Sequence, residues 1–215
     1  MSVKTILEGL GAPAEAVSWA ADYGDDMKRA WAECEHPELL LPMAAGVGVP
    51  NFDVLNAAVE VVRMNLDGIV IHPAVDKGFQ TIERFICDEA TDDEVLSVMS
   101  VMSQLTHDFD GASDSQLSSF GAVGTACEAA LMASQGCLDG MMGKLSVCVM
   151  LSAQAKAEAV APNGTDDVRG KVISVVLKRT APLVRRYIPY ESFVGGFVAS
   201  MRAGKDGEDE YVPEA

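Results

Sequence analysis

Apolar positions dominate the middle of the chain, from residue 118 to residue 161. The only charged side chains in this stretch are Glu128, Asp139, Lys144, Lys156 and Glu158. A turn sequence at 135–140 divides it into two helical segments, 118–134 and 139–161. A helix that is apolar nearly all round must be buried on nearly all sides. We therefore expect a buried helical hairpin at the centre of the fold.

A membrane span is the competing interpretation of this stretch, because about 18 consecutive apolar residues can cross a bilayer. Asp139 and Lys144 interrupt the apolar run, and Ser146, Ser152 and Gln154 dilute it with polar groups. We therefore expect a hairpin inside a water-soluble helical domain, with no membrane among its partners.

Helical periodicity continues on both sides of the hairpin. Apolar residues at three- and four-residue spacing predict further helices over 14–33, 38–45, 51–66, 73–90, 91–107 and 165–180. The first of these is a single long amphipathic helix that carries both tryptophans. Pro182 and Pro189 are expected to divide the remainder into short pieces.

Several helix starts have recognisable capping residues. Thr91 followed three residues later by Glu94 forms a capping box, which is the clearest local signal in the chain. Asn51 or Asp53 is expected to cap the helix that follows residue 50, and Asp114 or Ser115 the helix that leads into the hairpin.

No segment shows sustained alternation of apolar and polar residues, and the strand candidates at 69–71 and 172–176 lie inside helical patterns. The sequence therefore predicts an all-α fold, a multi-helix bundle or short helical array of about eight to ten helices around the central hairpin. We expect one helical domain over residues 1–203 and an acidic, solvated tail over 204–215.

Charge and composition restrict the partners. The chain has 215 residues, 49% of them hydrophobic, and a formal net charge of −16. This charge disfavours binding to nucleic acid or to an anionic membrane and permits a basic partner. The first eight residues contain one lysine and no sustained apolar run, unlike a secretory signal, so we expect a cytoplasmic protein.

The cysteines give no sign of chemistry. Cys34, Cys87, Cys127, Cys137 and Cys148 form no C-x-x-C pair, and each lies in a helical, largely apolar context. This pattern is typical of reduced, buried thiols with a structural role. A reactive thiol would need a basic or helix-N-terminal setting, and none is visible.

One loop could bind a metal ion. His107, Asp108 and Asp110 precede a glycine, and the segment 108–114 offers acids at two-residue steps. It lacks the bidentate glutamate of a twelve-residue calcium loop. Asp, Ser and Gly also dominate turns for backbone reasons alone. Loop capping is therefore the favoured interpretation, a metal site is the alternative, and no cofactor is expected.

The region 165–190 carries a positive net charge, whereas the chain as a whole is acidic. Its candidate binding residues are Arg179, Arg185, Arg186, Tyr187 and Tyr190. Three interpretations compete: contact with the protein's own acidic helices, binding of an anion, and contact with an acidic partner. Internal charge balance is favoured because the rest of the chain is so acidic, but Arg and Tyr are enriched at interface hot spots.

No common catalytic signature occurs in the chain, neither a Gly-rich phosphate loop nor Gly-x-Ser-x-Gly, His-Glu-x-x-His or Glu-x-x-His. This lowers the expectation of an enzyme without excluding one.

Two patches resemble small, all-helical bacterial proteins, some of them labelled immunity proteins of toxin systems. The first comprises residues 31–40, with Trp31, Cys34 and Pro37, followed by Ala-Ala-Gly-Val at 44–47. The second is Leu-Val-Arg-Arg-Tyr-Ile-Pro at 183–189. An acidic surface replaces the Arg-rich helices of those proteins. The resemblance implies an interaction protein without catalysis.

The leading hypothesis is therefore a cytoplasmic helical protein that binds, and by binding neutralises or regulates, a basic protein partner. The alternative from another class is a sensor or enzyme that binds a small ligand inside the bundle. A nucleic-acid mimic is a third hypothesis. A homodimer is also considered, because the methionines exceed what a tight core prefers; they are Met99, Met102, Met132, Met141, Met142 and Met150.

Overall fold

The structure is a computed structural model that describes residues 2–9 and 14–196. It contains ten helices with defined bounds and no strand within these residues. The helices are α1 Val3–Gly9, α2 Ala14–Ala21, α3 Met27–Glu33, α4 Pro37–Gly46, α5 Asn51–Leu66, α6 Pro73–Ile86, α7 Asp92–Asp108, α8 Asp114–Ser134, α9 Leu138–Val160 and α10 Asp166–Tyr187. Residues 190–196 are also helical. The predicted tail over 204–215 lies outside the described residues.

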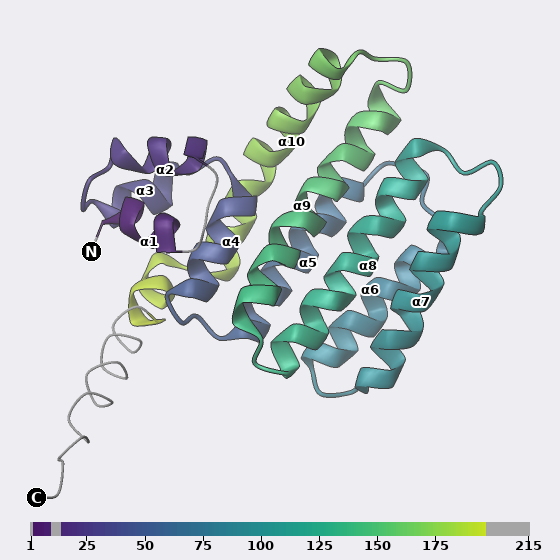
Figure 1. Cartoon of the computed structure of the whole chain (residues 1–215), viewed down its shortest axis with the longest axis horizontal. Coiled ribbons are helices and arrows are strands. Elements are labelled where there is room, and N and C mark those ends of the chain that lie inside the picture. The colour runs from purple at the N-terminus through teal and green to yellow at the C-terminus, as the bar shows by residue number, and fades with distance from the viewer. Residues whose placement is uncertain (1, 10–13, 197–215) are drawn as a thin grey trace, which may run out of the picture.

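The long helices form two layers (Figure 1). Helices α10, α9, α8 and α7 lie side by side in one layer, α5 and α6 pack behind them, and α4 packs against α9 and α10. The most extensive helix pair is α8 with α9, and α5 contacts α8, α9 and α10. The short helices α1–α3 lie beside α4 at one edge. The predicted all-α multi-helix array is confirmed.

The predicted central hairpin is confirmed as α8 and α9, which Gly136 joins through a left-handed turn with φ of 68°. Phe120, Leu145 and Val149 have no exposed surface. Helix α8 begins earlier than residue 118, because Ser113 caps it in a capping box with Gln116. The predicted caps, Asp114 and Ser115, are therefore wrong; both lie inside the helix.

Helix α9 is joined to α5 by a buried polar contact. The Asn65 side-chain amide donates to the Ser152 hydroxyl over 2.9 Å, and this hydroxyl donates to the Val149 carbonyl. Both polar side chains are fully buried, and the Asn65 carbonyl oxygen has no protein partner. Because an unmade hydrogen bond in the interior is costly, this contact specifies how α5 lies on α9.

The prediction of one helix over residues 14–33 is wrong. The chain turns after α2 at Gly24, whose φ of 53° is left-handed, and Asp26 then caps α3 by accepting a hydrogen bond from the Arg29 backbone N–H. Glycine adopts this backbone conformation without steric cost, and Asp is a preferred N-cap. The apolar spacing continued through the turn, so periodicity alone did not reveal the break.

Pro182 lies inside a helix, although the sequence predicted that a helix would end there. Helix α10 runs through Pro182 to Tyr187. Pro182 is exposed, so water can bind the carbonyl oxygen that loses its helical partner. The prediction was correct at Pro189, which follows the end of α10.

Two other boundaries differ from expectation. Helix α6 ends at Ile86 rather than near residue 90, because Asp88 has a left-handed φ of 61°. Pro50, not Asn51 or Asp53, occupies the N-cap position of α5. The Thr91 capping box at the start of α7 is confirmed.

Candidate functional site

Arg185 and Tyr190, two of the predicted binding residues, face the N-terminal helices. The Arg185 guanidinium donates to the carbonyl oxygens of Cys34, over 2.7 Å, and Trp31, over 3.3 Å. It thereby satisfies carbonyl groups at the end of α3, which would otherwise lack a helical partner. Partial burial lowers the pKa of Arg185. Tyr190 stacks on Phe193, with 6.2 Å between ring centroids. These two side chains are part of the internal packing.

Arg179, Arg186 and Tyr187 are exposed on α10. Their spacing places them around Leu183, at one turn before it and one turn after it. Tyr187 is 38% exposed, and burial followed by the nearby Glu60 carboxylate raises its pKa. The structure thus divides the predicted basic site into two sets. Arg185 and Tyr190 pack inside the protein, and Arg179, Arg186 and Tyr187 are exposed on α10.

The other cations of α10 are engaged within the chain. Lys171 pairs with Asp167, Lys178 pairs with Glu35, and Arg169 donates to the carbonyl oxygens at the end of α9. Internal charge balance, the favoured interpretation of this segment, therefore accounts for Lys171 and Lys178, and Arg169 binds uncharged backbone groups of the same chain.

The predicted metal-binding residues lie at the exposed end of α7. The Nδ1 atom of His107 is 2.7 Å from the Ser103 carbonyl oxygen, one turn back. Asp108 is the last residue of the helix, and Asp110 stands in the turn before Gly111. Within the described residues no three His, Cys, Asp or Glu side chains come together as ligands for a metal ion.

All five cysteines are free, and the structure corrects part of their prediction. Cys34, Cys127 and Cys148 are buried as expected, and burial raises the pKa of each thiol to about 12. Cys87 and Cys137 are exposed, because they stand at the end of α6 and before the start of α9. A pattern of apolar neighbours does not distinguish a helix interior from a helix end.

The methionines considered for a homodimer mostly contribute to the core. Met102, Met141 and Met142 are buried, and Met99 and Met132 pack against the buried cluster. Met150 is 39% exposed on α9. None of the described helices is long and apolar enough to span a bilayer.

A groove of about 500 Å³ lies between α5, the start of α6 and α10. Its apolar lining comes from all three helices and from the α5–α6 loop. The apolar side chains that line it are Met64, Leu66, Ile69, Ile71, Phe79 and Leu183. Arg63 forms part of one wall, where its guanidinium stacks over the Phe79 ring and pairs with Glu83. We call this hollow the α5–α6–α10 groove.

Three carboxylates surround this apolar lining. Glu60 projects from α5, Asp67 follows its last residue, and Asp76 belongs to the first turn of α6. None of them forms an ion pair with a described residue. Lys156 lies at the same end of α5 but donates to the Asp67 backbone carbonyl. The ammonium group of Lys156 keeps its positive charge there, but the three carboxylates outnumber it, so the α5–α6 side of the groove has a net negative charge.

The loop between α5 and α6 brings an apolar segment to the rim of the groove. Ile69 and Ile71 line the groove and are half-buried, whereas Val70 between them is 84% exposed. Val70 is the most exposed of the large apolar side chains in the described part of the chain. Such exposure leaves apolar surface in water without compensation from the fold.

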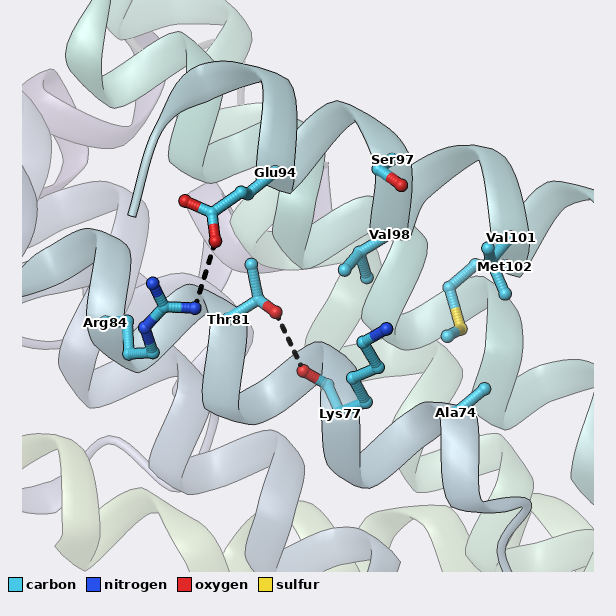
Figure 2. A pocket seen from close by; sticks show the side chains of 9 residues that line it. All are labelled: Ala74, Lys77, Thr81, Arg84, Glu94, Ser97, Val98, Val101 and Met102. Atoms are coloured by element: carbon cyan, nitrogen blue, oxygen red, sulfur yellow. Dashed lines mark hydrogen bonds and ion pairs between the residues drawn. The ribbon is translucent and has the colours of Figure 1, made fainter. Parts of the chain in front are cut away.

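A second, smaller depression of about 210 Å³ lies between α6 and α7 (Figure 2). Most of its polar groups are already satisfied. The Thr81 hydroxyl donates to the Lys77 carbonyl over 3.0 Å, and Arg84 pairs with Glu94 over 3.0 Å. Lys77 has the one ammonium group in the lining. The depression offers few groups for binding a ligand.

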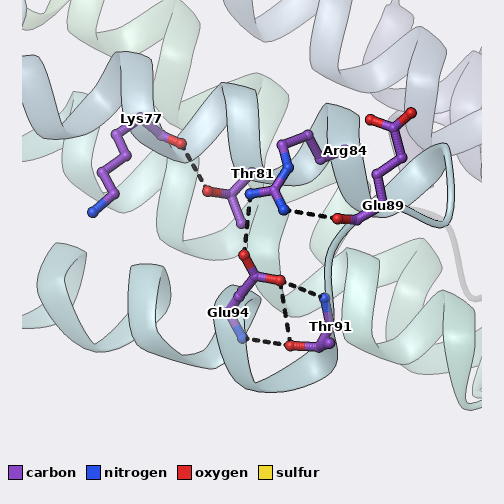
Figure 3. Close-up of polar contacts among 6 residues, drawn as sticks. All are labelled: Lys77, Thr81, Arg84, Glu89, Thr91 and Glu94. Carbon is purple, nitrogen blue, oxygen red and sulfur yellow. Dashed lines mark hydrogen bonds and ion pairs between the residues drawn. The ribbon is translucent and has the colours of Figure 1, made fainter.

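The Arg84 contacts hold the α6–α7 connection together (Figure 3). One side of the guanidinium pairs with Glu94, and the other donates to the Glu89 carbonyl over 2.7 Å. Glu94 also accepts from the Thr91 backbone N–H over 2.9 Å. This hydrogen bond, followed by Arg84, lowers the pKa of Glu94. The cluster therefore stabilises the packing of α6 against the start of α7.

Comparison with known proteins gives no relatives: no family model, no curated protein and no solved structure matches the chain.

Sequence reasoning missed the α5–α6–α10 groove. Its carboxylates and apolar lining are separated along the chain, and residues 69–71 were noted only as a strand candidate within a helical pattern. The one available signal was Asp67-Gly68 followed by this apolar run, since a loop that contains three β-branched residues is unusual.

Proposed function

We propose that the protein acts by binding another protein, and that this partner is basic. The observation that carries the proposal is the unequal use of charges on the surface. Most cations of the described residues are engaged with the chain itself, whereas many carboxylates are left without a counter-ion. A surface of this kind attracts a basic partner over a distance and repels an acidic one.

Seven cations form ion pairs with carboxylates of the same chain: Lys4, Arg29, Arg63, Arg84, Lys144, Lys171 and Lys178. Lys156, Arg169 and Arg185 donate to backbone carbonyl oxygens. Around the α6–α7 turn, by contrast, Glu89, Asp92 and Asp93 are exposed and have no ion pair with a described residue. The excess of negative charge is therefore a property of the accessible surface.

The expected setting is the cytoplasm, since free thiols are the rule in reducing compartments. The resemblance to immunity proteins suggests that binding neutralises the partner. Neutralisation requires the protein only to cover the partner's basic surface, and no catalytic group is needed.

A pull-down from native cytoplasm with the tagged protein, at low and at high salt, tests the proposal. We expect a stoichiometric basic protein at low salt and its loss at high salt, because salt screens exposed charges. A bait with Arg179→Ser and Arg186→Ser is the control, and it should capture the same protein. Capture of an acidic protein that depends on these arginines would overturn the proposal in favour of the predicted basic site.

A further inference from the structure

We propose that the α5–α6–α10 groove is where the basic partner binds, and that it receives an amphipathic segment whose large apolar side chains are flanked by lysine or arginine. This proposal rests on the proposed function and specifies its site. Three features of the groove support it: its apolar lining, the charges around that lining and the apolar rim.

The lining suits an apolar anchor. Met64, Ile69, Ile71, Phe79 and Leu183 present aliphatic and aromatic surface within a volume of about 500 Å³. Protein interfaces obtain most of their binding free energy from a few large side chains that enter pockets of this kind.

The charges around the lining select basic flanks. Glu60, Asp67 and Asp76 lie on the α5–α6 side, and Arg63, the cation within the lining, is paired with Glu83. On the α10 side, Arg179 and Arg186 flank Leu183. The charged side chains on the α5–α6 side are therefore mostly acidic, and those on the α10 side are basic. A bound segment gains most when its lysines or arginines face α5 and α6.

The rim extends the apolar surface out of the groove. Val70 is 84% exposed, and its neighbours Ile69 and Ile71 line the groove. A segment that places an anchor in the groove and passes over this loop removes Val70 from water, which contributes favourable free energy of binding. The fold itself gains little from Val70, so the residue can be changed without loss of stability.

The first test uses a fluorescein-labelled synthetic peptide with Phe and Leu anchors flanked by lysines, and measures binding by fluorescence anisotropy at low salt. The groove variant combines Glu60→Gln, Asp67→Asn and Asp76→Asn. The control variant combines Glu89→Gln, Asp92→Asn and Asp93→Asn, which change the net charge equally at the α6–α7 turn. We expect roughly tenfold weaker binding to the groove variant, from the loss of three ion pairs at the surface, and a change within about twofold for the control.

The second test addresses the apolar contact. Val70→Ser should weaken binding of the same peptide by roughly threefold to tenfold, whereas Val175→Ser, an exposed apolar position on α10, should not change it. A peptide whose Phe and Leu anchors are replaced by serine should bind Val70→Ser and Val175→Ser with equal affinity. Equal binding of the anchored peptide to both variants contradicts an apolar contact at this rim. Circular dichroism and thermal melts of every variant exclude unfolding as the cause.

The outcomes separate the site from the function. If both triple variants weaken binding equally, the peptide senses only the overall charge, and the groove is wrong while a basic partner stands. If a peptide with glutamates in place of the lysines binds as tightly as the basic one, both the groove and the basic partner are wrong. Selective loss with the groove variant and with Val70→Ser supports both.

Discussion

Helices α9 and α10 are neighbours of nearly equal length, 23 and 22 residues, but the fold buries many more residues of α9 than of α10. In α9, Leu145, Val149 and Ala153 have no exposed surface. In α10, Val168 is 43% exposed and Val175 is 66% exposed. The first helix lies between α8, α4, α5 and α10, whereas the second closes one edge of the array (Figure 1).

Because α9 is more buried than α10, we expect the two helices to contribute differently to stability and to binding. Side chains inside a close-packed interior tolerate little change, because each methyl group has partners on all sides. A helix at the edge of the array needs only part of its surface for packing, and the rest is free to present charge and to border a groove. We therefore expect substitutions on α9 to affect folding and those on the α10 side to affect binding.

The largest effect is expected from the same substitution placed in each helix. Val149→Ala removes two fully buried methyl groups and should lower the free energy of unfolding by about 2–3 kcal/mol. Val175→Ala should change it by less than about 0.5 kcal/mol, since its side chain already contacts water. Urea denaturation followed by circular dichroism measures both. Equal losses in the two variants would show that the edge helix is as tightly packed as the central one.

The polar contact between α9 and α5 gives the next test. Ser152→Ala leaves the Asn65 amide without its partner in the interior and should cost about 1–3 kcal/mol of unfolding free energy. Combining it with Asn65→Leu removes both polar groups and should recover part of the loss. A double variant less stable than Ser152→Ala would indicate that overpacking by the larger leucine outweighs the relief of the unmade hydrogen bond.

Glycine offers a smaller and more local comparison. A Cβ atom at Gly78 of α6 would lie 2.5 Å from the Val123 Cγ1 atom of α8, whereas one at Gly170 of α10 meets no atom within 4 Å. Gly78→Ala should therefore cost about 1–2 kcal/mol through overpacking. Gly170→Ala should stabilise by about 0.5–1 kcal/mol, because alanine is the better helix former. Thermal melts that show a gain in both variants would mean that α6 moves away from α8 at no cost.

The smallest effect depends on pH and lies outside both helices. The hydrogen bond from His36 to the Glu38 carboxylate, at 2.9 Å, is the main cause that raises the pKa of His36 above its usual value near 6.5. The protonated form is favoured in the folded state, so the stabilisation is fully present below about pH 6.5. It is lost as the pH rises through the folded-state pKa.

Urea denaturation of His36→Gln at acidic and at alkaline pH checks this sign. The variant should be less stable than the natural sequence at acidic pH and equal to it at alkaline pH. The contribution is small because the imidazole is half-exposed. A deficit that is the same at both pH values would contradict a role for the charge.

The sequence by itself determined the all-α class, the central hairpin and most helix positions. The reason is that helical periodicity and capping are local: the Thr91–Glu94 box lies within four consecutive residues. Local signals failed where the backbone took an unusual conformation inside a continuing pattern, as at Gly24, or where solvent access decided the outcome, as at Pro182.

Only the tertiary structure decided which charges remain free and where they gather. Arg185 reads as a binding residue in the sequence, but packing places it against the carbonyl oxygens of α3. Glu60, Asp67 and Asp76 carry no motif, and the crossing of α5, α6 and α10 brings them around one apolar groove. Such a surface depends on contacts between segments far apart in the chain, and the pattern within any one segment does not contain that information.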